Sequence, residues 1–230
     1  MAEIRTYATP MRLYRYRALT EDRIEQELDA IRDGYVFCPT IDRLNDPMEG
    51  SHRESSMLRE TPNLARTIEE VRNARSQLGV ASFSETYRHE PMWAYYAGNF
   101  EGMCVAYSLR QLLKALPPDH DFVRMSYSEK PPMLLRGGRS ADQRARLVLS
   151  AKTVRWASER EWRLISPGTG PARYGPAACV TRIYLGARAE RLADRIEDIA
   201  RPLGIRVYVM SVDQYALRFT NRANPSHPDD

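Results

Sequence analysis

Two glutamates and an arginine alternate within an apolar stretch late in the chain. Glu159, Glu161 and Arg163 are separated by single residues, and Trp162 and Leu164 occupy the positions between and after them. Side chains along a β-strand point alternately to its two faces, so a strand here would place the three charged residues on one face and the two apolar residues on the other. The pattern predicts a strand whose charged face meets solvent or lines a cleft.

Short strands and helices are predicted on both sides of this stretch in the sequence. Alternation, helical spacing and turn residues place strands at 13–17, 35–38, 80–84, 103–107, 122–127, 180–185, 205–210 and 215–219, and helices at 20–34, 61–79, 92–96, 108–116, 140–152 and 189–200. The irregular order of these elements predicts one α+β domain over residues 10–220. Residues 221–230 are polar and are expected to form a flexible C-terminal tail.

The composition is that of a soluble globular protein. Of 230 residues, 43% are hydrophobic and 28% are charged. No apolar run reaches the roughly 18 residues that a membrane span needs, and residues 1–5 lack the apolar core of a signal peptide. We therefore expect a cytoplasmic protein with no membrane partner. Cys38, Cys104 and Cys179 lie far apart, which supports neither a disulfide framework nor a zinc site and predicts small core residues.

The charge balance permits an anionic partner without requiring one. The net charge is +4 and the pI is about 9.0, which is compatible with nucleic acid or another anionic ligand. No glycine-rich phosphate loop follows an early strand, so a P-loop enzyme and a doubly wound dinucleotide-binding fold are both disfavoured.

Several motifs occur in an order that resembles a known family. They are Leu13 to Arg17, Asn45 to Glu49, Ser82 to Ser84 followed by Pro91 to Tyr96, and Lys152 to Arg163. In this order they resemble the bacterial family called domain of unknown function 2971, over most of the chain from Leu13 to about Tyr208. The family name implies no activity.

A more distant resemblance implies one. A basic first strand, a later serine strand and a final Glu-x-Glu strand are similar to the ADP-ribosyltransferases of the arginine-serine-glutamate type. The resemblance implies a central mixed or antiparallel split sheet with flanking helices, NAD as substrate, and Glu161 and Glu159 as catalytic residues. The residues expected around NAD are Arg15, Arg17, Tyr14, Ser82, Ser84, Trp93, Tyr96, Asn45, Asp46 and Glu49. One departure is Ser82-Phe83-Ser84, which stands where that class has Ser-Thr-Ser.

The chemistry of NAD cleavage explains these residue types. Breaking the bond to nicotinamide develops positive charge on the ribose, which a carboxylate at Glu161 would stabilise in the transition state. Glu159 would orient or deprotonate the acceptor, and Arg15 would bind the pyrophosphate. An aromatic ring such as Trp93 or Tyr96 would stack on the nicotinamide ring. This reaction requires no metal.

Three functions remain open from the sequence. The first is ADP-ribosyl transfer from NAD to a nucleic acid or protein, as in a toxin or anti-phage defence effector, with an antitoxin or partner protein as a further partner. The second is a metal-dependent nuclease that uses Asp46, Glu49, Glu159 and Glu161, because clustered carboxylates are the ligands that Mg²⁺ prefers. The third is a basic, non-catalytic module that binds nucleic acid or protein.

Overall fold

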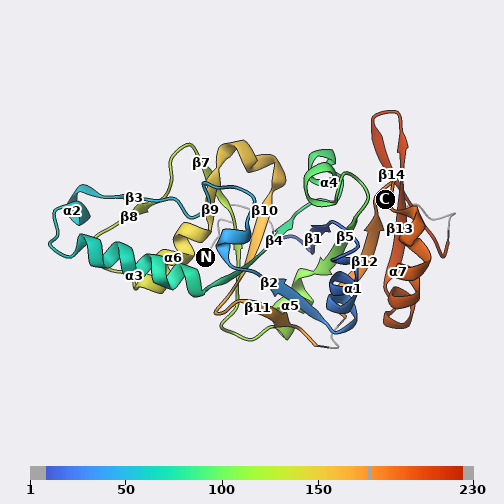
Figure 1. Ribbon diagram of the computed structural model, residues 1–230, viewed down its shortest axis with the longest axis horizontal. Helices are drawn as coiled ribbons and strands as arrows, with labels where there is room; N and C mark the ends of the chain where they lie inside the picture. Colours follow the sequence, from blue (N-terminus) through green and yellow to red (C-terminus); the bar gives the residue numbers. More distant parts are fainter. Residues whose placement is uncertain (1–8, 176–177, 225–230) are drawn as a thin grey trace, which may run out of the picture. The chain divides into compact units, whose positions relative to one another are not determined.

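The structure, a computed structural model, describes residues 9–175 and 178–224 (Figure 1). Its contacts divide the chain into two units. Among the described residues, the first unit contains 9–34, 84–115 and the part that begins at 174, and the second contains 35–83 and 116–173. The α+β class is confirmed, whereas the single domain over 10–220 stays a prediction.

The first unit is built on a mixed sheet. Its strands follow the order β14-β13-β12-β5-β1. The strands are β1 (Arg12–Arg17), β5 (Met103–Ser108), β12 (Val180–Leu185), β13 (Arg206–Asp213) and β14 (Ala216–Asn221). The β12–β13 pair is parallel, and the β1–β5, β5–β12 and β13–β14 pairs are antiparallel. The mixed character of the sheet is therefore as expected.

Helices flank this sheet. They are α1 (Ile24–Arg32), α4 (Glu90–Tyr96), α5 (Leu109–Ala115) and α7 (Ala193–Ala200), with 3-10 turns η3 (Glu190–Leu192) and η4 (Arg201–Leu203). The chain from β12 to β13 runs through α7, because parallel neighbours need a long crossover connection. Buried residues on one side of α7, including Ile196 and Ala200, let that helix pack on β13.

The second unit contains shorter strands and a pair of helices. Its main strands follow the order β4-β10-β6, with β10 and β6 antiparallel, and three small ladders join β2 to β11, β3 to β8 and β7 to β9. The strands are β2 (Tyr35–Cys38), β3 (Arg53–Glu54), β4 (Gly79–Ser84), β6 (Asp121–Arg124), β7 (Ser126–Ser128), β8 (Met133–Leu134), β9 (Ala151–Thr153), β10 (Glu161–Ser166) and β11 (Gly170–Arg173). The helical elements are η1 (Ile41–Arg43), α2 (Ser56–Arg59), α3 (Leu64–Gln77), α6 (Ala141–Leu149) and η2 (Val154–Glu159).

Helices α3 and α6 pack together beside these strands (Figure 1). Val71 of α3 and Val148 of α6 share a buried cluster with Leu58 and Leu134. Helix α6 begins at a capping box, in which the Ser140 hydroxyl accepts from the Gln143 N–H and the Gln143 side chain accepts from the Ser140 N–H. The start predicted for this helix at Ser140 is confirmed.

The strand predicted around the two glutamates begins later than expected. Glu159 ends the 3-10 turn η2, Arg160 adopts a left-handed conformation with φ of 47°, and β10 begins at Glu161. The prediction that Glu159 and Glu161 lie on one strand is wrong, because the chain folds back between Lys152 and Glu159 to form an ion pair. All six residues of β10 are buried, so its charged face does not meet solvent.

Three smaller expectations also change. The strand expected at 122–127 is interrupted at Met125 into β6 and β7, and residues 170–173, which lie outside every predicted element, form β11, which pairs with β2. Asn221, the first residue of the expected tail, pairs with Tyr208 as the end of β14. Two predictions lie outside the described residues: the flexible tail from 225 onward, and the lack of a signal-peptide core at residues 1–5.

Two further expectations concern the cysteines and the membrane. Cys38, Cys104 and Cys179 are buried free thiols, which confirms their prediction as core residues. Within residues 9–175 and 178–224, no helix combines the length and the apolar composition needed to cross a bilayer.

Candidate functional site

Five charged side chains of the second unit gather into one buried cluster. They are Glu49 from the loop before Gly50, Lys152 of β9, Glu159 at the end of η2, and Glu161 and Arg163 of β10. No side chain in this carboxylate cluster is more than 7% exposed. Charges removed from water in this way are stable only when they are paired, so their contacts define the site.

Lys152 lies between the three carboxylates. Its Nζ is 2.8 Å from Glu159 Oε2, 3.2 Å from Glu161 Oε2 and 3.7 Å from Glu49 Oε1. The Trp156 ring covers the same ammonium at 4.6 Å from the ring centroid. The ammonium thus occupies the position that a cation bound by these carboxylates would take.

Arg163 joins two of the same carboxylates from β10. Its Nε donates to Glu161 Oε1 at 2.7 Å, and one terminal nitrogen donates to Glu49 Oε1 at 2.6 Å. The other terminal nitrogen donates to the Leu149 carbonyl oxygen at 2.8 Å, at the end of α6. Arg163 therefore ties β10 to the Glu49 loop and to α6.

Glu161 is held from several sides. One carboxylate oxygen accepts from Arg163, the other from Lys152, and the Ser82 hydroxyl of β4 donates a further hydrogen bond. Its backbone N–H donates to the Tyr127 hydroxyl at 2.8 Å. Burial raises the pKa of Glu161, but the charges of Arg163 and Lys152 outweigh burial and hold that pKa below its usual value of 4.5. The carboxylate is therefore ionised at neutral pH.

The two cations are shifted in the opposite direction. Burial lowers the pKa of Lys152, but the neighbouring Glu161 and Glu159 outweigh it and raise the pKa above 10.5. The pKa of Arg163 is likewise raised, because its contacts with Glu161 and Glu49 exceed the effect of burial. Both groups remain charged across the physiological range.

The cluster contains more carboxylates than cations. Three carboxylates and two cations contact one another in it. Glu49 Oε2 is buried and accepts no hydrogen bond from the described residues. A buried, ionised carboxylate such as Glu161 favours positive charge that develops next to it.

Four of the twelve predicted site residues lie in or beside this cluster. Glu49, Glu159, Glu161 and Ser82 belong to it. Asp46 instead stabilises the turn that comes before Glu49 in the chain. Its Oδ1 accepts a hydrogen bond from the Met48 N–H at 2.9 Å, and Asp46 is buried. Asn45, in the same turn, is exposed.

The predicted basic residues belong to the first unit. Arg15 on β1 is 9% exposed, and its charge acts on Tyr107 and Tyr174. Arg17 forms an ion pair with Glu27 of α1, so it fixes that helix to the strand. Tyr14 points to the opposite face of β1, into an aromatic cluster.

The other predicted residues of the first unit are part of its packing. Ser84 is fully buried, and its hydroxyl accepts from the Thr86 N–H at 3.2 Å. Trp93 is fully buried and donates from Nε1 to the Tyr87 carbonyl oxygen at 2.7 Å. Tyr96 packs against the same core while partly exposed.

The described residues give no support to the nuclease alternative. No group of three or more His, Cys, Asp or Glu side chains among residues 9–175 and 178–224 is arranged to hold a metal ion. The carboxylates that alternative requires surround the Lys152 ammonium instead, and Asp46 is engaged in its turn.

Sequence reasoning missed the groups that hold the glutamates. Lys152 and Arg163 belong to a predicted motif but carry no predicted role, and Tyr127 is predicted only as the end of a strand. The spacing of Glu161 and Arg163, two residues apart on a strand, could have identified one ion pair. Nothing local marks Lys152, whose partners depend on the fold of η2.

Comparison of the chain with family models, curated proteins and solved structures found no match. The resemblance to domain of unknown function 2971 and the ADP-ribosyltransferase-like layout therefore remain predictions.

Proposed function

We propose that this protein transfers ADP-ribose from NAD to a nucleic acid or protein, with the carboxylate cluster as its reaction centre. The observation that carries this proposal is the state of Glu161. Its carboxylate is ionised and buried, and it accepts a hydrogen bond from Ser82. These are the glutamate and one of the two serines that the sequence pattern assigns to a single site.

The transfer would proceed as follows. The bond between ribose C1′ and the nicotinamide nitrogen breaks, and nicotinamide leaves with the bonding electron pair. Glu161 stabilises the positive charge that develops on the ribose. An oxygen or nitrogen of the acceptor then donates an electron pair to C1′, and its proton passes to Glu159.

The surrounding groups would serve this step. Lys152 and Arg163 keep Glu161 ionised by lowering its pKa. Ser82 is partly exposed although Glu161 is not, so the ribose would approach along Ser82. Substrate binding must therefore open this side of the cluster.

Incubation with NAD labelled on the adenylate moiety tests the proposal. We expect nicotinamide release and transfer of label to at least one of three acceptors, namely RNA, DNA or protein. Glu161→Gln should lower the rate by about 100-fold or more, as loss of a group that stabilises transition-state charge does in other enzymes. Glu69→Gln, on exposed α3, is the matched control and should retain the wild-type rate.

Two outcomes would overturn the proposal. One is wild-type protein that neither releases nicotinamide nor transfers label to any acceptor. The other is a Glu161→Gln variant as active as the control. Because Glu161→Gln leaves two buried cations with less compensation, its folding is checked by circular dichroism, and Ser82→Ala, which keeps both ion pairs, provides a second variant.

A further inference from the structure

Six basic side chains gather at one end of the second unit. They come from β3, from α2, from the chain on both sides of β8 and from α6, and Figure 1 shows α2, β3 and β8 near one end of α3. They are Arg53, Arg59, Lys130, Arg136, Arg139 and Arg144. We call these six residues the basic surface.

Hydrogen bonds hold the segments of the basic surface together. Strands β3 and β8 pair in parallel. Arg53 also donates from Nε to the Pro131 carbonyl oxygen at 3.0 Å, before β8, and Arg144 donates to the Leu135 carbonyl oxygen at 3.1 Å, after β8. The chain is therefore fixed by an arginine on each side of β8, so the basic residues that it carries are presented from an ordered backbone.

A glycine turn separates Arg136 from Arg139. Gly137 and Gly138 have φ of 73° and 74°, in the left-handed region that other residues rarely adopt. Among the described residues, no atom beyond the chain neighbours lies within 4 Å of the Cβ position at either glycine. The turn is therefore open, and both arginines beside it are exposed.

The cations of the basic surface have no carboxylate partner in the part of the chain that the structure describes. None of their nitrogens lies within 4.0 Å of an Asp or Glu oxygen there. Other arginines of α3 and α6 are neutralised, since Arg72 pairs with Glu69 and Arg146 pairs with two aspartates. Residues 53–60 and 129–144 together contain six basic and four acidic residues, which gives the surface a net positive charge.

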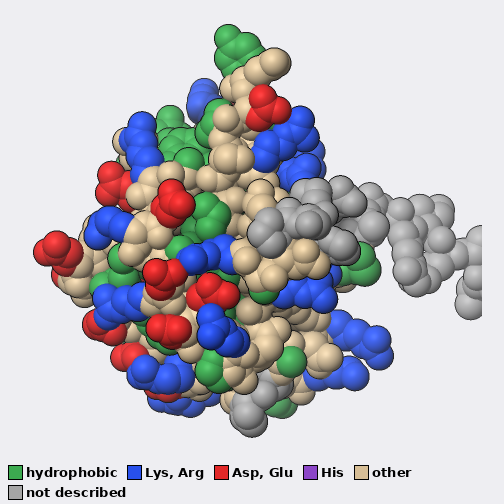
Figure 2. All heavy atoms as spheres, turned by 90° about the vertical axis from the view of Figure 1, so that its right-hand side faces the viewer, with side chains coloured by type: hydrophobic (Ala, Val, Ile, Leu, Met, Phe, Trp, Pro, Cys, Tyr) green, Lys and Arg blue, Asp and Glu red, His purple; other side chains and the backbone are tan. Residues whose placement is uncertain are grey.

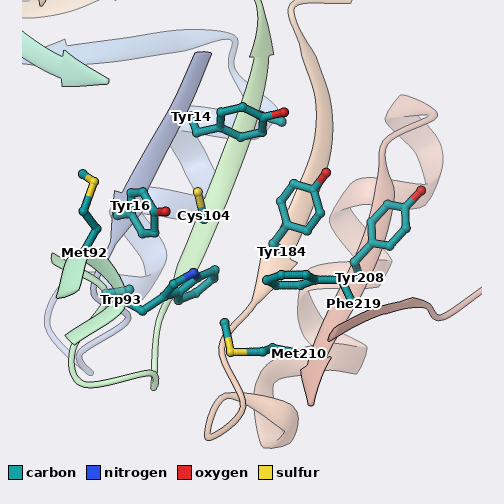
Figure 3. Close-up of a cluster of buried hydrophobic side chains, with 11 residues drawn as sticks. Tyr14, Tyr16, Met92, Trp93, Cys104, Tyr184, Tyr208, Met210 and Phe219 are labelled. Atoms are coloured by element: carbon teal, nitrogen blue, oxygen red, sulfur yellow. The ribbon is translucent and has the colours of Figure 1, made fainter. Parts of the chain in front are cut away.

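The first unit differs in how it uses aromatic and charged side chains. Its large aromatic residues, among them Trp93 and Phe219, pack into a buried cluster (Figure 3). Ion pairs such as that of Arg195 with Glu25 neutralise charges of this unit. The face in Figure 2 shows basic and acidic side chains interspersed. A polyanion would meet charges of both signs on such a face, in contrast to the basic surface.

We propose that the basic surface binds the phosphodiester backbone of nucleic acid. Five of its six residues are arginines, whose guanidinium groups match phosphate oxygens in geometry. A nucleic acid carries one negative charge per nucleotide, which suits cations that are spread over a strand, a helix and a loop. The core of a protein interface is usually depleted in charged residues, so six cations favour a polyanion over a protein partner. This binding requires neither NAD nor the carboxylate cluster.

Fluorescence anisotropy tests the site with labelled 20-nucleotide single-stranded RNA, single-stranded DNA and duplex DNA, in the absence of NAD. We expect wild-type protein to bind at least one of them. Arg136→Gln with Arg139→Gln should weaken that binding about tenfold, which is roughly threefold for each exposed charge. The slope of log affinity against log salt should fall by about 0.7–0.9 for each phosphate contact removed.

The matched control is Arg43→Gln with Arg173→Gln. It removes the same charge from exposed positions of η1 and β11 in the same unit, so its affinity should stay within about twofold of wild type. Arg136→Lys with Arg139→Lys keeps both charges and should retain the wild-type salt slope. Circular dichroism checks folding, which we expect to be unchanged because Arg136 and Arg139 are exposed.

Three outcomes would overturn the proposal. The first is wild-type protein that binds none of the oligonucleotides. The second is tighter binding of labelled polyglutamate than of any oligonucleotide, which would indicate an acidic protein partner instead. The third is equal weakening by the Arg136/Arg139 variant and the control, which would contradict the assignment of the site. Because these assays contain no NAD, their result is independent of whether the protein releases nicotinamide.

Discussion

Arg163 makes three polar contacts while almost completely buried, with Glu161, Glu49 and the Leu149 carbonyl oxygen. Removing one partner of a buried ion pair leaves its counterpart uncompensated, which costs roughly 3–5 kcal/mol. We therefore expect Arg163→Met to lower the free energy of unfolding by about that amount in urea titrations. Arg72→Met, whose exposed partner is Glu69, should cost less than about 1 kcal/mol. Equal losses would show that the cluster contributes no more than a surface pair.

The lowered pKa of Glu161 predicts an acid limit to stability. Its folded-state pKa lies below the ordinary 4.5, so its contribution is complete above that pH and is lost as pH falls through the folded value. The raised pKa of Lys152 has the opposite sign: its contribution is complete below 10.5 and is lost at higher pH. Thermal unfolding from pH 3 to pH 8 should show a steeper acid limb for wild type than for Glu161→Gln. Identical limbs would contradict the ionised, paired state of Glu161.

At the scale of elements, the capping box of α6 makes a separate prediction. Ser140→Ala removes the acceptor for the Gln143 N–H, which should destabilise the protein by about 1 kcal/mol. Ser140→Asp retains an acceptor and should stay within about 0.5 kcal/mol of wild type. Thermal denaturation of both variants measures the difference. A Ser140→Ala variant as stable as wild type would mean that packing against α3 is sufficient to stabilise α6.

Local sequence signals predicted most elements but not how the glutamates are held. Strands β1, β5 and β12 alternate or are bounded by turn residues, and the start of α6 is encoded by Ser140. The 3-10 turn before β10 was not predicted, because it depends on the Lys152–Glu159 ion pair and the Trp156 ring over the ammonium. Alternation alone cannot distinguish that arrangement from a strand.

At the scale of the whole molecule, the chain passes repeatedly between its two units. The second unit combines 35–83 with 116–173, and β4 from the earlier segment neighbours β10 from the later one. The sequence has no composition change at these crossings, so the division could not be predicted from it. Of the predicted site residues, Glu49, Ser82, Glu159 and Glu161 meet in the second unit, whereas Tyr14, Trp93 and Tyr96 pack in the aromatic core of the first unit.

This interleaving predicts that a contiguous fragment is insufficient. Residues 116–173 expressed alone lack β4, α3 and the Glu49 loop, so α6 loses its packing partner and Arg163 loses one carboxylate. We expect circular dichroism of the fragment to show no cooperative thermal transition. A cooperative transition would mean that the later segment folds without the earlier one.

The central claim is that Ser82 and Glu161 act together on NAD. The most direct measurement is the rate of nicotinamide release by wild type, Ser82→Ala, Glu161→Gln and the double variant. If Ser82 acts through Glu161, the double variant should be no slower than Glu161→Gln alone, because residues in contact do not contribute additively. A double variant whose loss of rate equals the product of the two single-variant losses would contradict a shared role. Wild-type protein that releases no nicotinamide would contradict the account as a whole.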